Sequence, residues 1–349
     1  MPEEKPILSF VCVSRNDNHG GNPLERLIYS CKNFIRQSEK FRASTEYIVV
    51  EWNPPPDRPS LVEALRGEIR SSKKTKVRLI QVPEAIHRKY DYSDKLPLFQ
   101  MIGKNAGIRR AQGEFVLSSN IDILLGDRIF SRVVNHSLKK EIIYRSHRLD
   151  IRNNILEQEF NEDLALNSAT RINVMPNTIQ LGLGAAILKN FRGFSARPAK
   201  QYRQIFYAKL SCFLKRLLRS DSKNNFPLHT NACGDFQLLD QKTWHRLGGF
   251  SEMEVYSFHL DSLFMYSALA NGVYSVVLPA PLYHYHIDHD HGWIPEDPGR
   301  LFNRLRSEKI GFLDQEIGII EELYRRRQLV PEPRNDWGLA GHKLEETIL

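Results

Sequence analysis

The sequence predicts an α/β fold built on a doubly wound, mixed but mostly parallel β-sheet flanked by helices. Continuous apolar runs such as residues 7–14 are typical of strands buried on both faces of a parallel sheet. These runs alternate with helical patterns through the first third of the chain, which is the order expected of βαβ units. Ligands of such sheets bind at the carboxyl ends of the strands. Polar residues that directly follow a strand are therefore candidate site residues.

The first half of the chain is assigned from these patterns in order. Asn22 is the expected N-cap of the first helix, and Pro23 suits its first position. Glu51 ends the second strand, and the prolines that follow it exclude a helix there. The assigned ranges are strands at residues 7–14, 45–51 and 77–82 and helices at residues 23–34 and 61–69.

Residues 104–126 show the same alternation of helix and strand within a short segment. A helix-compatible run ends at Gly113, an apolar strand covers residues 115–117, and Asn120, Ile121 and Asp122 follow the strand. Asp122 is expected to point into the crevice at the strand end, where its carboxylate could bind a hard divalent cation. The alternative is that Asp122 only caps the next turn.

The second half is less regular. Residues 129–137 are predicted to form a helix and residues 141–150 a strand, whereas residues 151–195 give no assignment. Residues 202–219 carry apolar side chains at helical intervals opposite Lys and Arg. Such a helix either lies on an anionic membrane or packs its apolar side on the domain and exposes its charges.

Residues 231–252 and the helix that follows them contain a second group of candidate site residues. Gly234 and Asp235 begin a strand, a short helix surrounds Trp244, and Asp261 opens a further helix about ten residues after this segment ends. A carboxylate at that position could orient or deprotonate a hydroxyl group. The alternative is an ordinary acid in the first turn of a helix.

Histidine and aspartate are concentrated between residues 284 and 291. Strand alternation gives His284 and His286 the same face, and Asp288, His289, Asp290 and His291 follow. Imidazole with carboxylate is a credible ligand set for Mn²⁺. The alternative is a solvated loop. Beyond it, residues 300–327 are predicted to form a closing helix and residues 330–349 a packed tail.

Composition limits the class of protein. The 349 residues, 41% of them hydrophobic, suffice for one large domain or two smaller ones. The absence of a long apolar run or a signal-peptide pattern predicts a soluble, cytoplasmic chain, and four cysteines without C-x-x-C spacing do not predict a zinc site. Eight basic residues against Asp221 give residues 197–223 a net charge of +7 out of +8. This local charge does not indicate a nucleic-acid partner.

The motifs at residues 104–122 and 231–261 resemble those of GT-A-fold glycosyltransferases of the family-2 and galactosyltransferase kind. Asn105, Gly107, Ala111 and Gly113 match the first module, with Asn120-Ile121-Asp122 in place of a D-x-D triplet. Gly234, Asp235, Gly248, Gly249 and Asp261 match the second. Two departures stand out, because Asn120 replaces the first acid of the triplet and Leu260 leaves Asp261 as the single acid of the later motif.

The resemblance implies roles for particular residues. Asp122 with His284 or His286 would bind Mn²⁺ or Mg²⁺, and Asp261 would be the catalytic residue. Acceptor contacts are implied for Gly234, Asp235 and His259. Contacts to the nucleotide sugar are implied for Ser14, Arg15, Asn16, Asp17, Glu51, Lys104, Asn105, Arg109, Asn120 and Ile121.

The expected function is transfer of a sugar from a nucleoside-diphosphate sugar, most simply a UDP-sugar, to the hydroxyl group of a carbohydrate or lipid-linked acceptor. Residues 1–130 would form the nucleotide-sugar half, residues 131–300 the acceptor half with a basic insertion at 197–223, and residues 301–349 a C-terminal helix and tail. The insertion could contact anionic membrane. Two alternatives stay open, a non-catalytic sugar- or partner-binding protein on the same scaffold and a nucleotidyltransferase. Inversion or retention of the anomeric centre is not decided.

Overall fold

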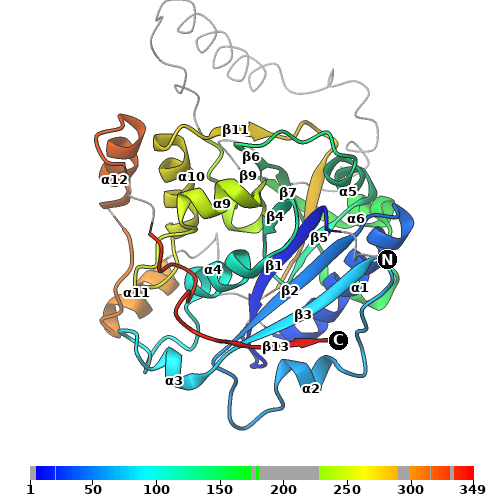
Figure 1. The fold of residues 1–349 in the computed structure, drawn as a ribbon, viewed down its shortest axis with the longest axis horizontal. Helices are drawn as coiled ribbons and strands as arrows, with labels where there is room; N and C mark the ends of the chain where they lie inside the picture. Colours follow the sequence, from blue (N-terminus) through cyan, green and yellow to red (C-terminus); the bar gives the residue numbers. More distant parts are fainter. Residues whose placement is uncertain are drawn as a thin grey trace, which may run out of the picture.

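A large mixed sheet runs through the molecule (Figure 1). The computed structural model describes residues 5–19, 21–173, 178–180, 228–289, 299–314, 316–330 and 334–349. The eight strands of the larger sheet have the order β11-β6-β10-β4-β1-β2-β3-β13. Their bounds are β1 Leu8–Ser14, β2 Thr45–Trp52, β3 Thr75–Val82, β4 Phe115–Ser118, β6 Ile142–Arg145, β10 Gln237–Asp240, β11 Tyr274–Val277 and β13 Glu345–Ile348.

The parallel centre of this sheet defines the edge at which ligands of such sheets bind. Strand β1 pairs in parallel with β2 on one side and with β4 on the other, and β3 continues beyond β2. The order of strands therefore reverses at β1, which makes the carboxyl ends of β1 and β4 a topological switch point. Strand β10 lies antiparallel between β4 and β6. The predicted α/β class with a mostly parallel sheet is confirmed.

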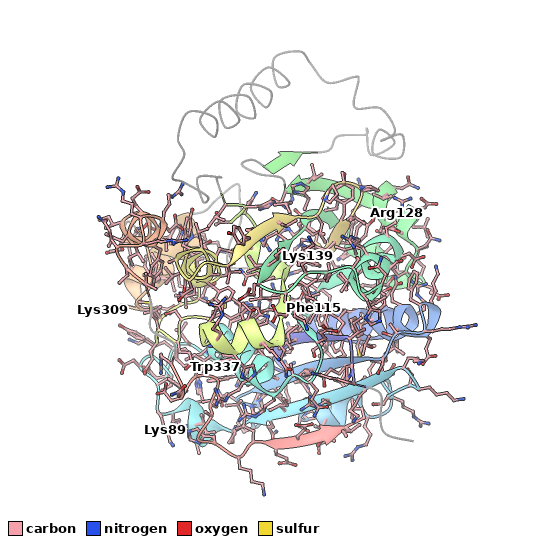
Figure 2. All side chains as sticks on the ribbon, turned by 45° about the horizontal axis from the view of Figure 1, so that its top comes forward. Lys89, Phe115, Arg128, Lys139, Lys309 and Trp337 are labelled. Atoms are coloured by element: carbon pink, nitrogen blue, oxygen red, sulfur yellow. The ribbon has the colours of Figure 1, made fainter. Side chains whose placement is uncertain are left out.

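Helices cover both faces, as the unbroken apolar strands require. On β1, Val11 and Val13 belong to the core that includes helix α4, whereas Phe10 and Cys12 belong to the core that includes α1. The helices are α1 Pro23–Lys40, α2 Leu61–Leu65, α3 Glu84–His87, α4 Gln100–Arg110, α5 Asp127–Val134, α6 Glu162–Ser168, α9 Gln241–Leu247, α10 Leu260–Ala270, α11 Gly299–Ser307 and α12 Glu316–Arg325. Phe115 lies inside the molecule, while Lys89 and Lys309 lie at its periphery (Figure 2).

A second, five-stranded sheet was not predicted. Its order is β5-β12-β7-β8-β9, and its own apolar core includes Leu149 and Tyr285. Its strands are β5 Ile123–Leu125, β7 His147–Ile151, β8 Ala169–Asn173, β9 Thr178–Gln180 and β12 Tyr283–Ile287. Residues 141–150, predicted as one strand, divide at Ser146 into β6 of the larger sheet and β7 of the smaller one. The chain thereby joins the two sheets.

The sequence-based boundaries differ from the structure in several elements. Helix α1 extends to Lys40, α2 ends at Leu65, and the predicted helix 300–327 divides into α11 and α12. Asn22 occupies the N-cap position of α1 in a left-handed conformation but forms no side-chain capping bond, while Pro23 stands at the start of the helix as predicted. Lys309 has a φ of 56°, which is incompatible with an unbroken helix.

The larger sheet draws its strands from all three predicted segments of the chain. Strand β13, part of the predicted tail, pairs antiparallel with β3 at the edge of the sheet. Cys12, Cys31 and Cys233 are buried free thiols. Within the described ranges, every helix is too short or too polar to cross a bilayer. The predicted basic helix at 202–219 lies outside the described residues, as do Asp290 and His291.

Candidate functional site

Strand pairing in the smaller sheet brings Asp122 to the end of β12. Asp122 lies in the turn between β4 and β5, one residue before Ile123. Ile123 pairs with His286 across the antiparallel β5/β12 ladder. The amide of Ile287 then donates to the carbonyl oxygen of Asp122 over 3.0 Å. Residues that are separated by more than 160 positions in the sequence are therefore fixed side by side by backbone hydrogen bonds.

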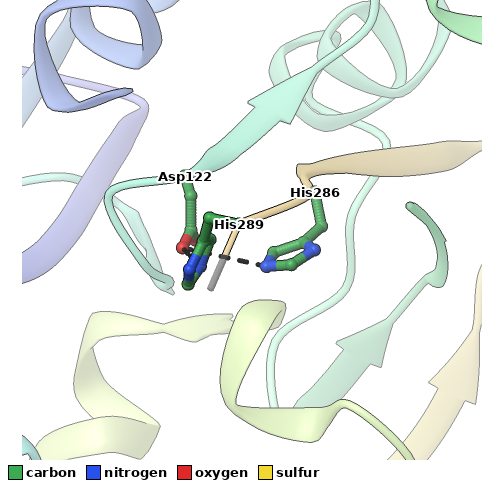
Figure 3. A group of neighbouring side chains, drawn as sticks. All are labelled: Asp122, His286 and His289. Atoms are coloured by element: carbon green, nitrogen blue, oxygen red, sulfur yellow. Dashed lines mark hydrogen bonds and ion pairs between the residues drawn. The ribbon is translucent and has the colours of Figure 1, made fainter. Parts of the chain in front are cut away.

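Asp122, His286 and His289 form a group that could hold a metal ion (Figure 3). Asp122 Oδ2 lies 2.8 Å from His289 Nε2 and 3.8 Å from His286 Nε2. The three ligand atoms all lie within 4.8 Å of one another. Asp122 Oδ1 is buried and accepts no hydrogen bond from any described residue. A buried carboxylate oxygen without a partner is uncommon, and a cation at this position would supply the missing interaction.

The electrostatic surroundings keep Asp122 ionised. Burial alone would raise the pKa of its carboxyl group, but attraction to His286 and the hydrogen bond from His289 outweigh burial, so the pKa lies well below its usual range. One carboxylate and two imidazoles suit first-row transition metals such as Mn²⁺ better than Mg²⁺, which prefers oxygen ligands. The same ligand types also occur in non-haem iron(II) sites.

His284 does not join this group. Its ring stacks on Phe236 with centroids 5.4 Å apart, and its Nδ1 lies 3.1 Å from Ser146 Oγ. His284 precedes His286 by two positions on β12, which places it about 7 Å farther from the strand end where Asp122 lies. The third member of the group is instead His289. Its place in the histidine-aspartate cluster was visible in the sequence, but the return of the chain after β12 was not.

A crevice of about 1030 Å³ lies next to the metal group, although Asp122, His286 and His289 do not line it themselves. Asn120 borders it just after β4, and Asp150 of β7, in contact with His286, borders it as well. All the residues for which acceptor contacts were predicted, Gly234, Asp235 and His259, line it together with Asp261. A smaller cavity, of about 550 Å³, lies between α1 and residues 156–160 and contains none of these side chains.

Asp261 stands in the first turn of α10, close to the backbone of Gly234. The amide of Ser262 donates to Asp261 Oδ1 over 2.8 Å. A Cβ atom on Gly234 would lie only 2.8 Å from Asp261 Oδ2, so the glycine leaves the space that this oxygen occupies. Asp261 Oδ1 thus accepts a backbone hydrogen bond, while Oδ2 lies against Gly234, where any larger residue would crowd it.

Lys104 lies buried beneath the crevice, close to Gly234, Asp235 and Asp261. Its side chain is fully buried, and its Nζ donates to the carbonyl oxygen of Gly234 over 2.9 Å. Burial lowers the pKa of the ammonium group, although the charges of Asp235 and Asp261 oppose this shift. A buried cation close to carboxylates offsets their repulsion, so Lys104 stabilises the floor of the crevice. Its nitrogen is not at the crevice surface, where a direct contact to a nucleotide sugar would be made.

Asn120 has a structural reason to be an amide. Its Nδ2 donates to Asp235 Oδ1 over 2.7 Å, and its Oδ1 accepts from Gln100 Nε2 over 3.0 Å. A carboxylate at position 120 could not donate to Asp235 and would repel it. The hydrogen bond to Asp235 therefore explains why this chain has Asn120 where a D-x-D triplet has its first acid. Ile121 packs against the apolar core that includes α1.

The polar residues after β1 and β2 hold their loops. Arg15 Nε donates to the carbonyl oxygen of Asn53 over 2.6 Å, and its NH1 lies 3.2 Å from Asp17 Oδ2. Asn16 Nδ2 donates to the carbonyl oxygen of Pro59. These contacts fix the surface beside the switch point. Whether these side chains contact a nucleoside stays a prediction.

Ser14 is the last residue of β1 and Glu51 the last but one of β2, and both are buried. Glu51 accepts from the amide of Leu61 at the start of α2 over 2.7 Å, and burial raises the pKa of its carboxyl group. Its carboxylate therefore supports a helix start. A role for either residue in binding the nucleotide sugar stays a prediction.

Two predicted contact residues of α4 lie elsewhere. Asn105 exchanges hydrogen bonds with the backbone of Phe250 and also donates to Glu252. The guanidinium group of Arg109 lies over the ring of Trp337, 5.2 Å from its centroid. Both residues join α4 to the loop after α9 and to the C-terminal segment. Neither borders the crevice.

No family model matches the sequence, and no curated protein matches it. The chemistry of the group and the crevice therefore carries the functional argument.

Proposed function

We propose that this chain is a GT-A-type glycosyltransferase that moves a sugar from a nucleoside-diphosphate sugar, with a UDP-sugar as the expected donor, to a hydroxyl acceptor. One observation carries the proposal. A group able to hold a metal, Asp122-His286-His289, adjoins a crevice that contains a second carboxylate, Asp261, at the switch point of a mostly parallel sheet. The motif resemblance at residues 104–122 and 231–261 supports the same reading.

The metal group and Asp261 would serve different partners of a sugar transfer, the leaving diphosphate and the acceptor hydroxyl group. A divalent cation held by Asp122, His286 and His289 would neutralise charge on the leaving diphosphate. Asp261 would accept a hydrogen bond from the acceptor hydroxyl group and orient or deprotonate it. The distance between these sides is spanned by the crevice, whose volume suits a sugar with part of its carrier. Direct attack by the hydroxyl would invert the anomeric centre.

The acceptor is proposed to be a carbohydrate or a lipid-linked sugar. Tyr256, Phe258 and Phe302 line the crevice together with Asp261, which gives it aromatic as well as polar surface. The basic segment at 197–223 would bring the enzyme to anionic membrane if the acceptor is lipid-linked. Cytoplasmic location is part of the same proposal.

Release of nucleoside diphosphate tests the proposal. Chelator-treated protein is incubated with a panel of sugar nucleotides, with and without Mn²⁺, and free nucleoside diphosphate is measured. We expect Mn²⁺-dependent release from one donor class and a loss of about 10²–10⁴-fold in rate for Asp261→Asn. Asp127→Asn is the matched control, because Asp127 also stands in the first turn of a helix but pairs with Lys40 outside the crevice. Absence of release and of thermal stabilisation by every donor would contradict the proposal.

A further inference from the structure

We propose that Asp150 is a positioning residue that holds the His286 ring with Nε2 directed at Asp122, and that Arg148 and Arg171 hold Asp150 in turn. The inference rests on the proposed metal function of Asp122, His286 and His289. It adds a second layer to that group, contributed by strands β7 and β8. No sequence motif pointed to these residues.

The register of the smaller sheet brings Asp150 to His286. Strands β7 and β12 are parallel, and Asp150 pairs directly with His286 in their ladder. His286 Nδ1 lies 3.0 Å from Asp150 Oδ1, while Nε2, across the same ring, lies 3.8 Å from Asp122 Oδ2. The ring is therefore held between two carboxylates, one at each nitrogen.

The partners of Asp150 decide which nitrogen of His286 is free for a metal. Arg148 Nε lies 2.8 Å from Asp150 Oδ1, Arg171 Nε lies 2.9 Å from Oδ2, and Asn173 Nδ2 donates to Oδ2 over 3.3 Å. Paired with two guanidinium groups, the Asp150 carboxylate is ionised and can only accept a hydrogen bond from His286. Nδ1 must then carry the proton, and the lone pair of a neutral ring is on Nε2, toward Asp122. A carboxylate behind a ligating imidazole fixes its tautomer and orientation and strengthens it as a ligand.

Each of the two arginines also forms a second ion pair, which fixes its position beside Asp150. Arg148 NH1 lies 2.7 Å from Asp235 Oδ2, and Arg171 NH2 lies 3.0 Å from Asp288 Oδ1. Asp150 itself is almost completely buried, with 1% of its side chain exposed. Two guanidinium groups offset the cost of burying this carboxylate. The network also links the metal group to Asp235, which lines the crevice.

A purely structural clamp would have different consequences from a positioning residue. If Asp150 only tied β7, β8 and β12 together, its loss would lower stability without a specific effect on metal affinity. Asp150→Asn keeps the volume of the side chain and removes its charge. Glu46→Gln is the matched control, because Glu46 is also a fully buried carboxylate paired with an arginine, Arg78, over 2.6 Å. It lies at the start of β2 in the larger sheet, at the end opposite the carboxyl ends of β1 and β2.

The test measures Mn²⁺ binding by the full-length chain from the loss of the free-ion electron paramagnetic resonance signal. We expect Asp150→Asn to weaken Mn²⁺ binding about 10–100-fold and Glu46→Gln to leave it within twofold of the wild type. An Asp150→Asn protein that binds Mn²⁺ within twofold of the wild type would overturn the role of Asp150 alone. A wild-type protein that binds no Mn²⁺ would overturn the metal function itself.

A second measurement needs no substitution at Asp150, so it holds even if that variant fails to fold. The wild-type protein is loaded with Zn²⁺ as a diamagnetic probe, and its imidazole nitrogens are observed by ¹⁵N nuclear magnetic resonance. His286 is assigned by comparison with His286→Gln. We expect the metal on Nε2 and a retained proton on Nδ1. A metal on Nδ1, or a proton on Nε2, would overturn the proposal.

Discussion

At the scale of the residue, Gly234 is a position where the lack of a side chain determines what a neighbouring carboxylate can do. A Cβ there would lie 2.8 Å from Asp261 Oδ2, the far end of a side chain that is able to turn away. We therefore expect Gly234→Ala to fold with nearly unchanged stability and to lose sugar transfer on the order of 100-fold, because the carboxylate is displaced. Nucleoside-diphosphate release and the thermal midpoint are measured together.

Gly67→Ala is the control for this substitution, since an added Cβ at Gly67 meets no atom within 4 Å. It should change neither rate nor midpoint appreciably. If Gly234→Ala kept the full rate of the wild type, the carboxylate of Asp261 would not need its observed position.

The residues of the site differ in how far the sequence could identify them. Asp122 and Asp261 were selected as candidates because each stands next to or within an element whose pattern is plain in the sequence. Asp150 was missed, together with Arg148 and Arg171 that pair with it, because it meets His286 only through the register of a second sheet whose strands give no continuous apolar pattern. His289 was visible as part of a cluster, but the cluster alone could not distinguish it from His284.

At the scale of the element, helix α4 approaches the sheet closely at Gly107. A Cβ at this residue would lie 2.5 Å from Val11 Cγ1 and 3.0 Å from Val50 Cγ2, both on buried strands. Branched side chains on central strands have little freedom to move away. We expect Gly107→Ala to lower the free energy of unfolding by about 1–3 kcal/mol, as measured by urea denaturation.

Gly318→Ala provides the matched comparison within a helix. Gly318 lies in α12, and an added Cβ there meets no atom within 4 Å. Its replacement should raise the free energy of unfolding by about 0.5–1 kcal/mol, because alanine loses less backbone entropy in a helix. Equal effects of the two substitutions would rule out the close approach of α4 to β1 as the cause.

Elements with an unbroken pattern were predicted well, and elements shaped by tertiary contacts were not. Strands β1, β2 and β3 follow from continuous apolar runs, since burial on both faces leaves no alternation to misread. The division at Ser146 between β6 and β7 was missed because a single residue separates the two strands and no glycine or proline marks the break. Strand β13 was missed because Glu345 and Glu346 at an edge strand resemble a polar tail.

At the scale of the whole molecule, an ion pair ties the C-terminal strand to the sheet. Arg78 contacts Glu46 and, over 2.6 Å, Glu346 of β13. The hydrogen bond from Arg78 lowers the pKa of Glu346, partial burial opposes the shift, and attraction to Arg78 adds to it. A lowered pKa in the folded state contributes stability above the unfolded-state pKa, about 4.3 for Glu, that is lost as the pH falls through the folded-state value.

The pH dependence follows from this sign. Glu346→Gln should reduce stability at pH 7, and the difference from the wild type should shrink as the pH falls below about 4.3. Urea denaturation at a series of pH values measures it, with Glu345→Gln, an exposed neighbour on the same strand, as the control. A difference that grew toward low pH would contradict the ion pair as its source. Because Glu346 is partly exposed, the effect should also weaken in salt.

The central claim is that Asp122, His286 and His289 hold a divalent cation that takes part in nucleotide-sugar binding. The most direct measurement is calorimetric titration of chelator-treated protein with UDP, with and without added Mn²⁺, for the wild type and Asp122→Asn. The account predicts that the wild type binds UDP tightly only with Mn²⁺ and that the substitution removes this dependence. Equal UDP affinity with and without Mn²⁺ in the wild type, or undiminished Mn²⁺ dependence in Asp122→Asn, would contradict it.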